Sequence, residues 1–268
     1  MKLSTTNKTM FIPFIVAGDP YPDVTVELAL ALQQAGASIL ELGVPYSDPL
    51  ADGPIIQRAA QRALKHEMTL KKAIELVSLM RKKGLKIPII LFTYYNPVLQ
   101  LGEEYFFALA RKNNVDGVLI PDLPFEESGH IRQLSEQSGL SFISLVAPTS
   151  RNRIKKIASE AQGFLYCVSS LGVTGIRDTL PNELYEFLAE VKAHSRVPVA
   201  VGFGISRSEQ IQTLKDHCDG VVIGSALVQK IEQLADCLKQ EETRKDALIE
   251  FQQYAQSLVE PLQCNEMR

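Results

Sequence analysis

Eight short apolar runs, rich in Ile, Val, Leu and Phe, recur along this chain of 268 residues, and a longer amphipathic segment follows each of them. The runs are residues 11–17, 38–44, 87–94, 117–123, 141–147, 164–169, 197–203 and 220–224. Strands that alternate with helices are typical of parallel βαβ units. Eight near-equal units without a break in composition predict an α/β fold, a single (β/α)8 TIM barrel over residues 1–268, in preference to a doubly wound open sheet.

The segments between the runs carry apolar residues at three- and four-residue spacing, as at Val24, Leu28 and Leu32, which predicts helices. These helices are expected over residues 23–35, 54–64, 70–82, 103–112, 126–137, 151–161, 181–193 and 208–216. Thr69 is a typical N-cap and Gly84 a typical C-terminal stop. Extra helices are expected in the second unit and, at 226–237 and 244–259, after the eighth run.

Composition narrows the class of function. The net charge is -3, and no run of like charges indicates a nucleic-acid surface or an acidic tail. No apolar stretch reaches the roughly 20 residues that span a bilayer, and the short one at 10–16 is interrupted by Pro13. Four scattered cysteines are typical of reduced thiols. We therefore expect a cytoplasmic protein that acts on a small molecule, with no nucleic acid and no membrane partner.

The stretch 38–53, SILELGVPYSDPLADG, carries three acids where a strand gives way to a loop. Because side chains alternate along a strand, Glu41 shares a face with Ile39 and Gly43, opposite a uniformly apolar face that should meet the helices. Glu41 therefore points into the barrel mouth, where partial desolvation raises a carboxyl pKa toward the range useful for acid/base catalysis. A structural ion pair is the alternative, but no basic residue occupies a strand end.

Asp48 and Asp52 lie in the loop after this strand, among residues that restrict the backbone. Each is a good turn former, since Asp hydrogen-bonds its local backbone, and Asp52 could cap the helix that begins near Pro54. Taken singly, each Asp is therefore expected to be a turn or helix-cap residue.

Glycines follow the sixth, seventh and eighth runs. The segments GFGIS (202–206) and IGSA (223–226) let backbone N–H groups approach an anion, and a helix that begins after Ser225 would direct its dipole at that anion. This is the usual phosphate position in such barrels. SSLGVTG (169–175) fits either a flap over the mouth, with Gly175 as a further phosphate donor, or a surface loop. Tyr166 either projects into the pocket or packs in the core.

Missing residue types exclude other chemistry. All four histidines fall in helical segments and no Cys/His pair has ligand spacing, so no metal site is expected. No lysine occupies a strand interior, which argues against a Schiff-base aldolase. What remains is a cofactor-free acid/base reaction on a phosphorylated substrate.

Several ordered motifs resemble those of the tryptophan synthase alpha subunit family. They are FIPFIVAGDP (11–20), ELGVPYSDPLADGP (41–54), LFTYYNP (91–97), IPDLPFEES (120–128), SSLGVTG (169–175), VGFGIS (201–206) and VIGSA (222–226). The resemblance covers nearly the whole chain. One departure is Val16, where the family commonly has Thr.

The resemblance implies a lyase that cleaves indole-3-glycerol phosphate to indole and glyceraldehyde 3-phosphate in L-tryptophan biosynthesis. Glu41 would protonate indole C3 and accept the side-chain hydroxyl proton, Asp52 would stabilise the indole N–H, and Tyr166 would position the reacting group. The implied binding residues are Gly175, Gly204, Gly224 and Ser225 for the phosphate, and Phe14, Ile56, Leu119 and Phe203 for the indole.

The resemblance also implies a partner, the pyridoxal-phosphate-dependent beta subunit in an α2β2 complex. No cofactor is expected in this chain itself. Loops 45–56 and 170–181 would close the site and carry the signal between subunits. Two other functions stay open: another phosphate-handling barrel, such as a sugar-phosphate isomerase or indole-glycerol-phosphate synthase, and a barrel without catalysis that only activates a beta subunit.

Overall fold

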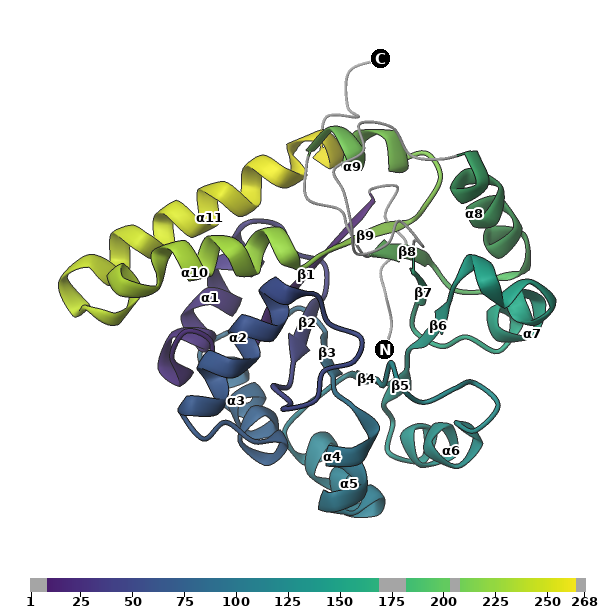
Figure 1. Cartoon of the computed structure of the whole chain (residues 1–268), viewed down its shortest axis with the longest axis horizontal. Helices are drawn as coiled ribbons and strands as arrows, with labels where there is room; N and C mark the ends of the chain where they lie inside the picture. Colours follow the sequence, from purple (N-terminus) through teal and green to yellow (C-terminus); the bar gives the residue numbers. More distant parts are fainter. Residues whose placement is uncertain (1–8, 169–181, 203–207, 264–268) are drawn as a thin grey trace.

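The structure is a computed structural model that describes residues 9–168, 182–202 and 208–263. Parallel strands form an almost closed barrel, and helices surround it (Figure 1). The strands are β1 (Met10–Val16), β2 (Leu40–Gly43), β3 (Ile89–Phe92), β4 (Gly117–Leu119), β5 (Ser141–Phe142), β6 (Ser144–Val146), β7 (Leu165–Val168), β8 (Val199–Gly202) and β9 (Gly220–Ile223). The predicted TIM barrel is therefore confirmed.

Nine strands arise from the eight apolar runs because the fifth run is divided. Its halves, β5 and β6, are the two ends of the sheet order β5-β4-β3-β2-β1-β9-β8-β7-β6. The N–H of Ile143, between them, still donates to Val118 of β4 over 2.8 Å. One continuous segment thus pairs with β4 at its start and with β7 at its end, which brings the two edges of the sheet together.

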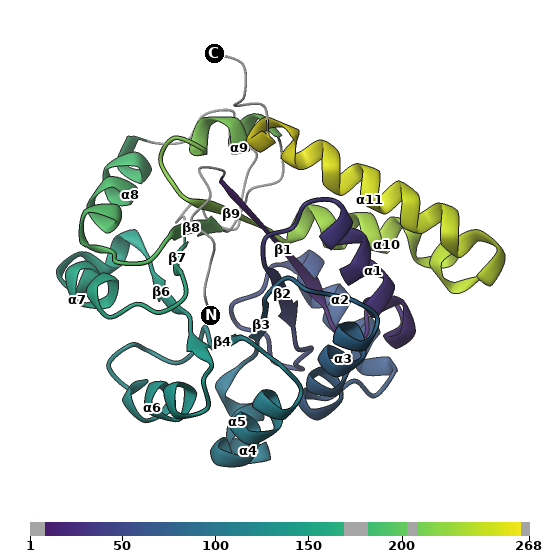
Figure 2. The same cartoon turned by 180° about the vertical axis from the view of Figure 1, so that it is seen from behind.

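The helices cover the outside of the barrel (Figures 1 and 2). They are α1 (Pro22–Gln34), α2 (Pro54–Lys65), α3 (Leu70–Lys82), α4 (Tyr95–Leu101), α5 (Glu103–Lys112), α6 (Gly129–Gln137), the 3-10 helix η1 (Pro148–Arg153), α7 (Ile154–Ser159), α8 (Asn182–His194), α9 (Ser208–Leu214), α10 (Ser225–Lys239) and α11 (Glu241–Gln263). The last helix lies across the outer side of α1, α9 and α10. The sequence did not predict α4, and it placed the start of α6 too early.

Local signals explain where several helices begin and end. The Thr69 hydroxyl accepts a hydrogen bond from the Lys72 N–H, as an N-cap does. Gly84, after α3, has φ +100°, a conformation that residues with a Cβ rarely adopt. None of the helices in the described residues is both long and apolar enough to cross a membrane.

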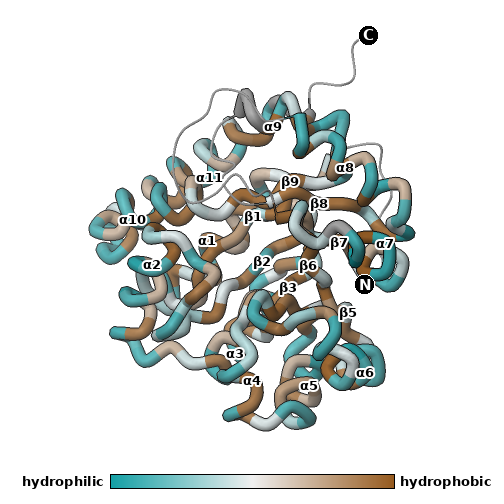
Figure 3. The backbone as a smooth tube through the Cα atoms, turned by 45° about the vertical axis from the view of Figure 1, so that its right-hand side comes forward, coloured by the Kyte–Doolittle hydropathy of each residue, from teal (hydrophilic) through white to brown (hydrophobic). Residues whose placement is uncertain are grey.

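Apolar side chains fill both the barrel and the layer between strands and helices. Figure 3 shows hydrophobic strands at the centre and hydrophilic stretches on the outer helices. Among the largest fully buried side chains are Ile12, Ile15, Leu40, Leu42 and Phe106. Every residue of β1 and of β2 is buried, as in strands that are covered on both faces.

Two aspartates fix the strands at the N-terminal end of the barrel. The Asp116 carboxylate accepts the Ile89 N–H over 2.8 Å and binds the Arg81 guanidinium. Asp219 repeats this arrangement by accepting the Val199 N–H over 2.8 Å and pairing with Lys192. Each aspartate precedes one strand and satisfies the first backbone donor of its neighbour, which fixes the register of both pairs.

Candidate active site

Glu41 lies in β2 between Phe14 of β1 and Ile90 of β3, at one level of the barrel. Its side chain is 1 % exposed, and Oε1 has no hydrogen-bond partner among the described residues. Burial raises its pKa from 4.5 to about 8, because the charged form is poorly solvated there. Glu41 is therefore mainly neutral near pH 7 and holds a proton that it can donate. The ion-pair alternative finds no partner in the described structure.

Asp52 lies near the end of the β2–α2 loop (residues 44–53). Burial raises its pKa from 3.8 to about 6, while a hydrogen bond from the Tyr94 hydroxyl counteracts part of that rise. Asp52 is therefore mostly ionised at neutral pH. Its side chain does not cap α2, whose N-cap is Gly53; only its carbonyl oxygen contacts the helix, accepting from the Gln57 amide over 2.9 Å.

Tyr166 lies in β7, across the barrel from Glu41. Burial raises its pKa, and Glu41 and Asp52 raise it further, which places Tyr166 within electrostatic reach of both acids. Its side chain occupies the space above Gly202, because a Cβ at Gly202 would lie 2.0 Å from the Tyr166 hydroxyl oxygen. Tyr166 is thus buried and faces the barrel interior, and its catalytic role stays a prediction.

Apolar side chains lie beside Glu41. The Phe14 ring is perpendicular to the Phe92 ring, with centroids 5.5 Å apart. Phe92 pairs with Leu119 on the next strand. Phe14 also covers Gly43, where a Cβ would lie 2.4 Å from the ring. Two of the residues predicted for indole contact, Phe14 and Leu119, are therefore both neighbours of Phe92.

The other predicted binding residues are less uniformly placed. Ile56 is buried in the first turn of α2, which packs on β1. Gly224 precedes α10, and a Cβ there would lie 3.4 Å from the Phe14 side chain, so the start of this helix is at the same end of the barrel as Phe14. Ser225 is the first residue of α10. Gly175, Phe203 and Gly204, together with loop 170–181, lie outside the described residues.

An ion-pair network anchors α2, which begins two residues after Asp52. Arg62 donates to both carboxylate oxygens of Asp19 over 2.7 and 3.1 Å, and to Glu232 of α10 over 2.6 Å. Asp19 follows β1 and is buried, and burial raises its pKa. Arg58 also pairs with Glu232. The helix that fixes one end of the β2–α2 loop is thus tied to two other parts of the barrel.

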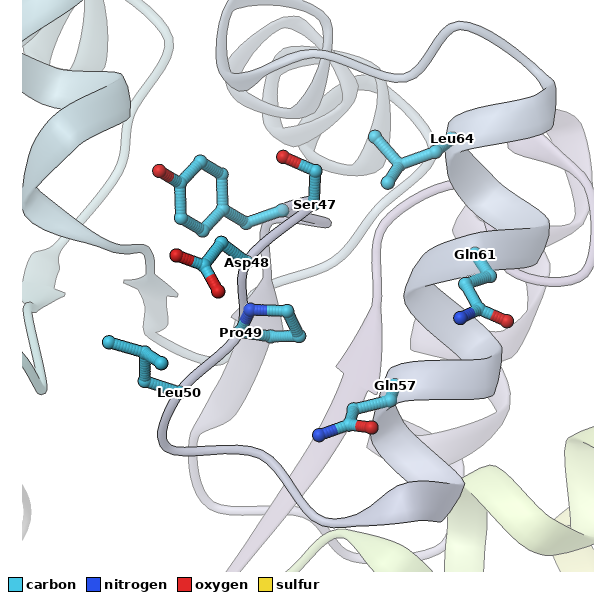
Figure 4. Close-up of a pocket in the computed structure, with 8 residues that line it drawn as sticks. Ser47, Asp48, Pro49, Leu50, Gln57, Gln61 and Leu64 are labelled. Atoms are coloured by element: carbon cyan, nitrogen blue, oxygen red, sulfur yellow. The ribbon is translucent and has the colours of Figure 1, made fainter.

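The outer side of the β2–α2 loop forms a surface pocket of about 470 Å³ against α2. Figure 4 shows Gln57, Gln61 and Leu64 along the side of α2 that faces the loop residues 47–50. Asp48 lies in this exposed part of the loop. Leu50 is 82 % exposed, which is unusual for so apolar a side chain. Asp48 is thus exposed to solvent, whereas Glu41 and Tyr166 are buried.

Two residues of this region were not assigned a role from the sequence. Phe92 and Tyr94 both belong to the motif LFTYYNP, whose run of aromatic residues at a strand end was the available signal. Val16, the departure from the family pattern, is a buried residue that pairs with Gly43 at the end of β2. Within the described residues, no group of three or more His, Cys, Asp or Glu side chains could hold a metal ion.

The buried Glu41 gives stability a specific pH dependence. Between about pH 4.5 and 8 the native carboxyl is neutral while the unfolded one is ionised, so the native state binds the extra proton. We expect Glu41 to lower the free energy of unfolding by up to about 1.4 kcal/mol per pH unit over that range. Urea unfolding of the wild type and Glu41→Gln at pH 5, 6.5 and 8 measures this. Parallel pH profiles for the two proteins would contradict it.

Comparisons of the sequence with known proteins all match one protein family. The family model described as tryptophan synthase alpha chain matches residues 1–258. The tryptophan synthase alpha chain of Geobacillus sp. (strain WCH70) is 76% identical over 262 residues, which cover 98% of this chain and 100% of that one. That of Geobacillus stearothermophilus is 70% identical over 262 residues, covering 98% and 97%.

Solved structures agree with the barrel. The tryptophan synthase subunit alpha from Legionella pneumophila str. Paris superposes with a TM-score of 0.84 at 36% identity, covering 95% of this chain and 93% of that chain. A chain from the tryptophan synthase a2b2 complex of Pyrococcus furiosus gives a TM-score of 0.84 at 36% identity, covering 94% and 98%.

Proposed function

Because the chain belongs to the tryptophan synthase alpha chain family, whose members cleave indole-3-glycerol phosphate to indole and glyceraldehyde 3-phosphate, we propose that Glu41, Asp52 and Tyr166 perform this cleavage. The protein is a carbon–carbon lyase of the alpha reaction. The observation that carries the residue assignment is the buried Glu41 carboxyl, whose Oε1 has no partner among the described residues. Glu41 and Asp52 both raise the pKa of Tyr166.

In the first step Glu41 donates its proton to C3 of the indole ring. The ring electrons form the new C3–H bond and leave positive charge centred on the ring nitrogen, whose N–H donates to the Asp52 carboxylate. Asp52 is charged at neutral pH, so its attraction for the ring grows as the positive charge develops.

In the second step the Glu41 carboxylate recovers a proton from the hydroxyl on the carbon attached to C3. The C–O bond becomes the aldehyde carbonyl of glyceraldehyde 3-phosphate, the C–C bond breaks, and its electrons restore the indole ring. One buried carboxyl serves both steps, because its anion is poorly solvated and regains a proton readily. Tyr166 would position the reacting carbon from the opposite side.

We place the substrate phosphate near Gly224 and Ser225, where backbone N–H groups at the start of α10 have no partner within the helix. Gly175 and Gly204 remain proposed contributors. Phe14 and Leu119, with Ile56 and Phe203, would contact the indole. The acid/base reaction needs no cofactor in this chain; pyridoxal phosphate belongs to the beta subunit of the family.

We also propose that the chain forms an α2β2 complex with a tryptophan synthase beta subunit, like its relative from Pyrococcus furiosus, that it forms one domain, and that it acts in the cytoplasm. Exposed Asp48 and Leu50 make the β2–α2 loop the candidate contact. Indole release from indole-3-glycerol phosphate, measured with and without the beta subunit, tests activity and partnership together. Release is expected in both cases and faster with the partner. No release in either case would refute the activity, and release unaffected by the partner would refute the complex.

A further inference from the structure

Tyr94 connects the end of β3 to the loop that carries Asp52. Its hydroxyl oxygen accepts the Ala51 N–H over 3.0 Å. The hydroxyl also lies close enough to the Asp52 carboxylate to lower the pKa of that group. One phenol group therefore holds the backbone immediately before Asp52 and acts on the Asp52 side chain. We propose that Tyr94 is a positioning residue for Asp52, which fixes the direction of its carboxylate toward the ring nitrogen of the substrate.

The Tyr94 ring is itself fixed by the barrel. Its side chain is 2 % exposed, and the ring lies against Phe92 and Tyr46, with centroids 6.4 and 5.2 Å away. The backbone before it continues the β3–β4 ladder, since the Thr93 N–H donates to the Leu119 carbonyl over 3.0 Å. A phenol held this firmly loses little conformational entropy when it binds the loop.

The β2–α2 loop has few other contacts that could orient Asp52. Within the loop, the N–H groups of Leu50 and Asp52 donate to the carbonyls of Asp48 and Pro49, which shapes a turn but leaves the carboxylate direction free. The Gln57 amide binds only the Asp52 carbonyl. Among the described residues, the Tyr94 hydroxyl is thus the contact that acts on the carboxylate itself.

Charge supplies the second part of the role. The groups that act on or near Asp52 are Tyr94, which follows β3, and Tyr166 of β7. Glu41 also acts on Tyr166, and Asp122 acts on Tyr94. Tyr94 is the donor that favours the charged carboxylate against the effect of burial. Loss of its hydroxyl would raise the pKa of Asp52 and leave more of the neutral, inactive form near pH 6.

The test rests on the proposed role of Asp52 and uses Tyr94→Phe, which keeps the ring and removes the hydroxyl. Indole release is measured from pH 5 to 9 with saturating beta subunit. We expect kcat to fall about tenfold, as for one hydrogen bond to a charged group, with its acidic limb moved to higher pH. The neighbour Tyr95→Phe is the matched control, since the Tyr95 hydroxyl binds Glu103 instead and its loss should change neither quantity.

The Tyr94→Phe change is also made in a protein that already carries Asp52→Asn. This second background distinguishes an effect through Asp52 from a general structural effect. In Asp52→Asn the added Tyr94→Phe change should lower kcat by less than about twofold, because coupled residues are not additive. The same tenfold loss in both backgrounds, or a Tyr94→Phe profile identical to wild type, would overturn the proposal. Wild-type protein without indole release would instead refute the proposed function, so the two failures are distinguishable.

Discussion

Glu41→Gln is expected to release indole about 10²- to 10⁴-fold more slowly than the wild type, the range associated with loss of a general acid or base. Gln has nearly the same shape as neutral Glu, so it should occupy the same space between β1 and β3. It cannot give a proton to C3 or take one from the hydroxyl. Because one group performs both transfers, its loss should affect the chemical step and leave the binding of glycerol 3-phosphate unchanged.

The measurement is single-turnover indole release with the beta subunit present, accompanied by glycerol 3-phosphate binding. Glu136→Gln is the matched control, because this glutamate is exposed on α6 and should tolerate the change. Near-normal turnover by folded Glu41→Gln would refute the acid/base assignment. Equal stimulation of the beta subunit by both proteins, with cleavage by neither, would support the non-catalytic alternative instead.

The barrel and its inward acid could be predicted because both depend on short-range pattern. The alternation of side chains along residues 38–44 placed Glu41 on the face opposite Leu40 and Leu42. In the structure Glu41 is buried and pairs with Phe14 and Ile90 on the neighbouring strands. The apolar runs likewise located every strand, apart from the break at Ile143 that divides the fifth run. Such a break depends on how the sheet closes on itself, which a local pattern does not record.

Helix α4 could not be predicted for a physical reason. It is short, contains Pro97, and has no side-chain cap from its own N-cap residue. Its start is stabilised from the following unit, where Asp122 accepts the Tyr95 N–H over 2.9 and 3.2 Å. A cap supplied from 27 residues away leaves no signal near the helix itself.

The same holds for the surroundings of Asp52. Its sequence context alone favoured a turn or a helix cap, and only the family resemblance indicated a catalytic group. The effect of the Tyr94 hydroxyl on its pKa, which distinguishes it from Asp48, comes from a residue that follows another strand, β3. From the sequence, Tyr94 was only one aromatic residue in a motif. Its proposed role depends on a contact with a loop that is distant in sequence, which the spacing of residues does not indicate.

Asp52→Asn should lower kcat by about 10²-fold or more, since a buried charge directed at developing charge is worth roughly that much. Asn can still accept a hydrogen bond from the indole N–H, but it supplies no negative charge for the protonated ring. KM should change little, because the substrate ring is neutral and the missing attraction develops only in the transition state. Asp246→Asn, which changes an exposed acid on α11, is the matched control at saturating beta subunit.

The pH profile of kcat/KM gives this prediction its sharpest test, because kcat/KM reports the ionisations of the free protein. The reaction needs Asp52 ionised and Glu41 protonated, with pKa values of about 6 and about 8 in the free protein, so wild-type activity should be lost below the first and above the second. Asp52→Asn should lose the acidic limb and keep the alkaline limb, because only Glu41 still titrates in the working range. An acidic limb unchanged in Asp52→Asn would assign that ionisation to another group and remove Asp52 from the mechanism.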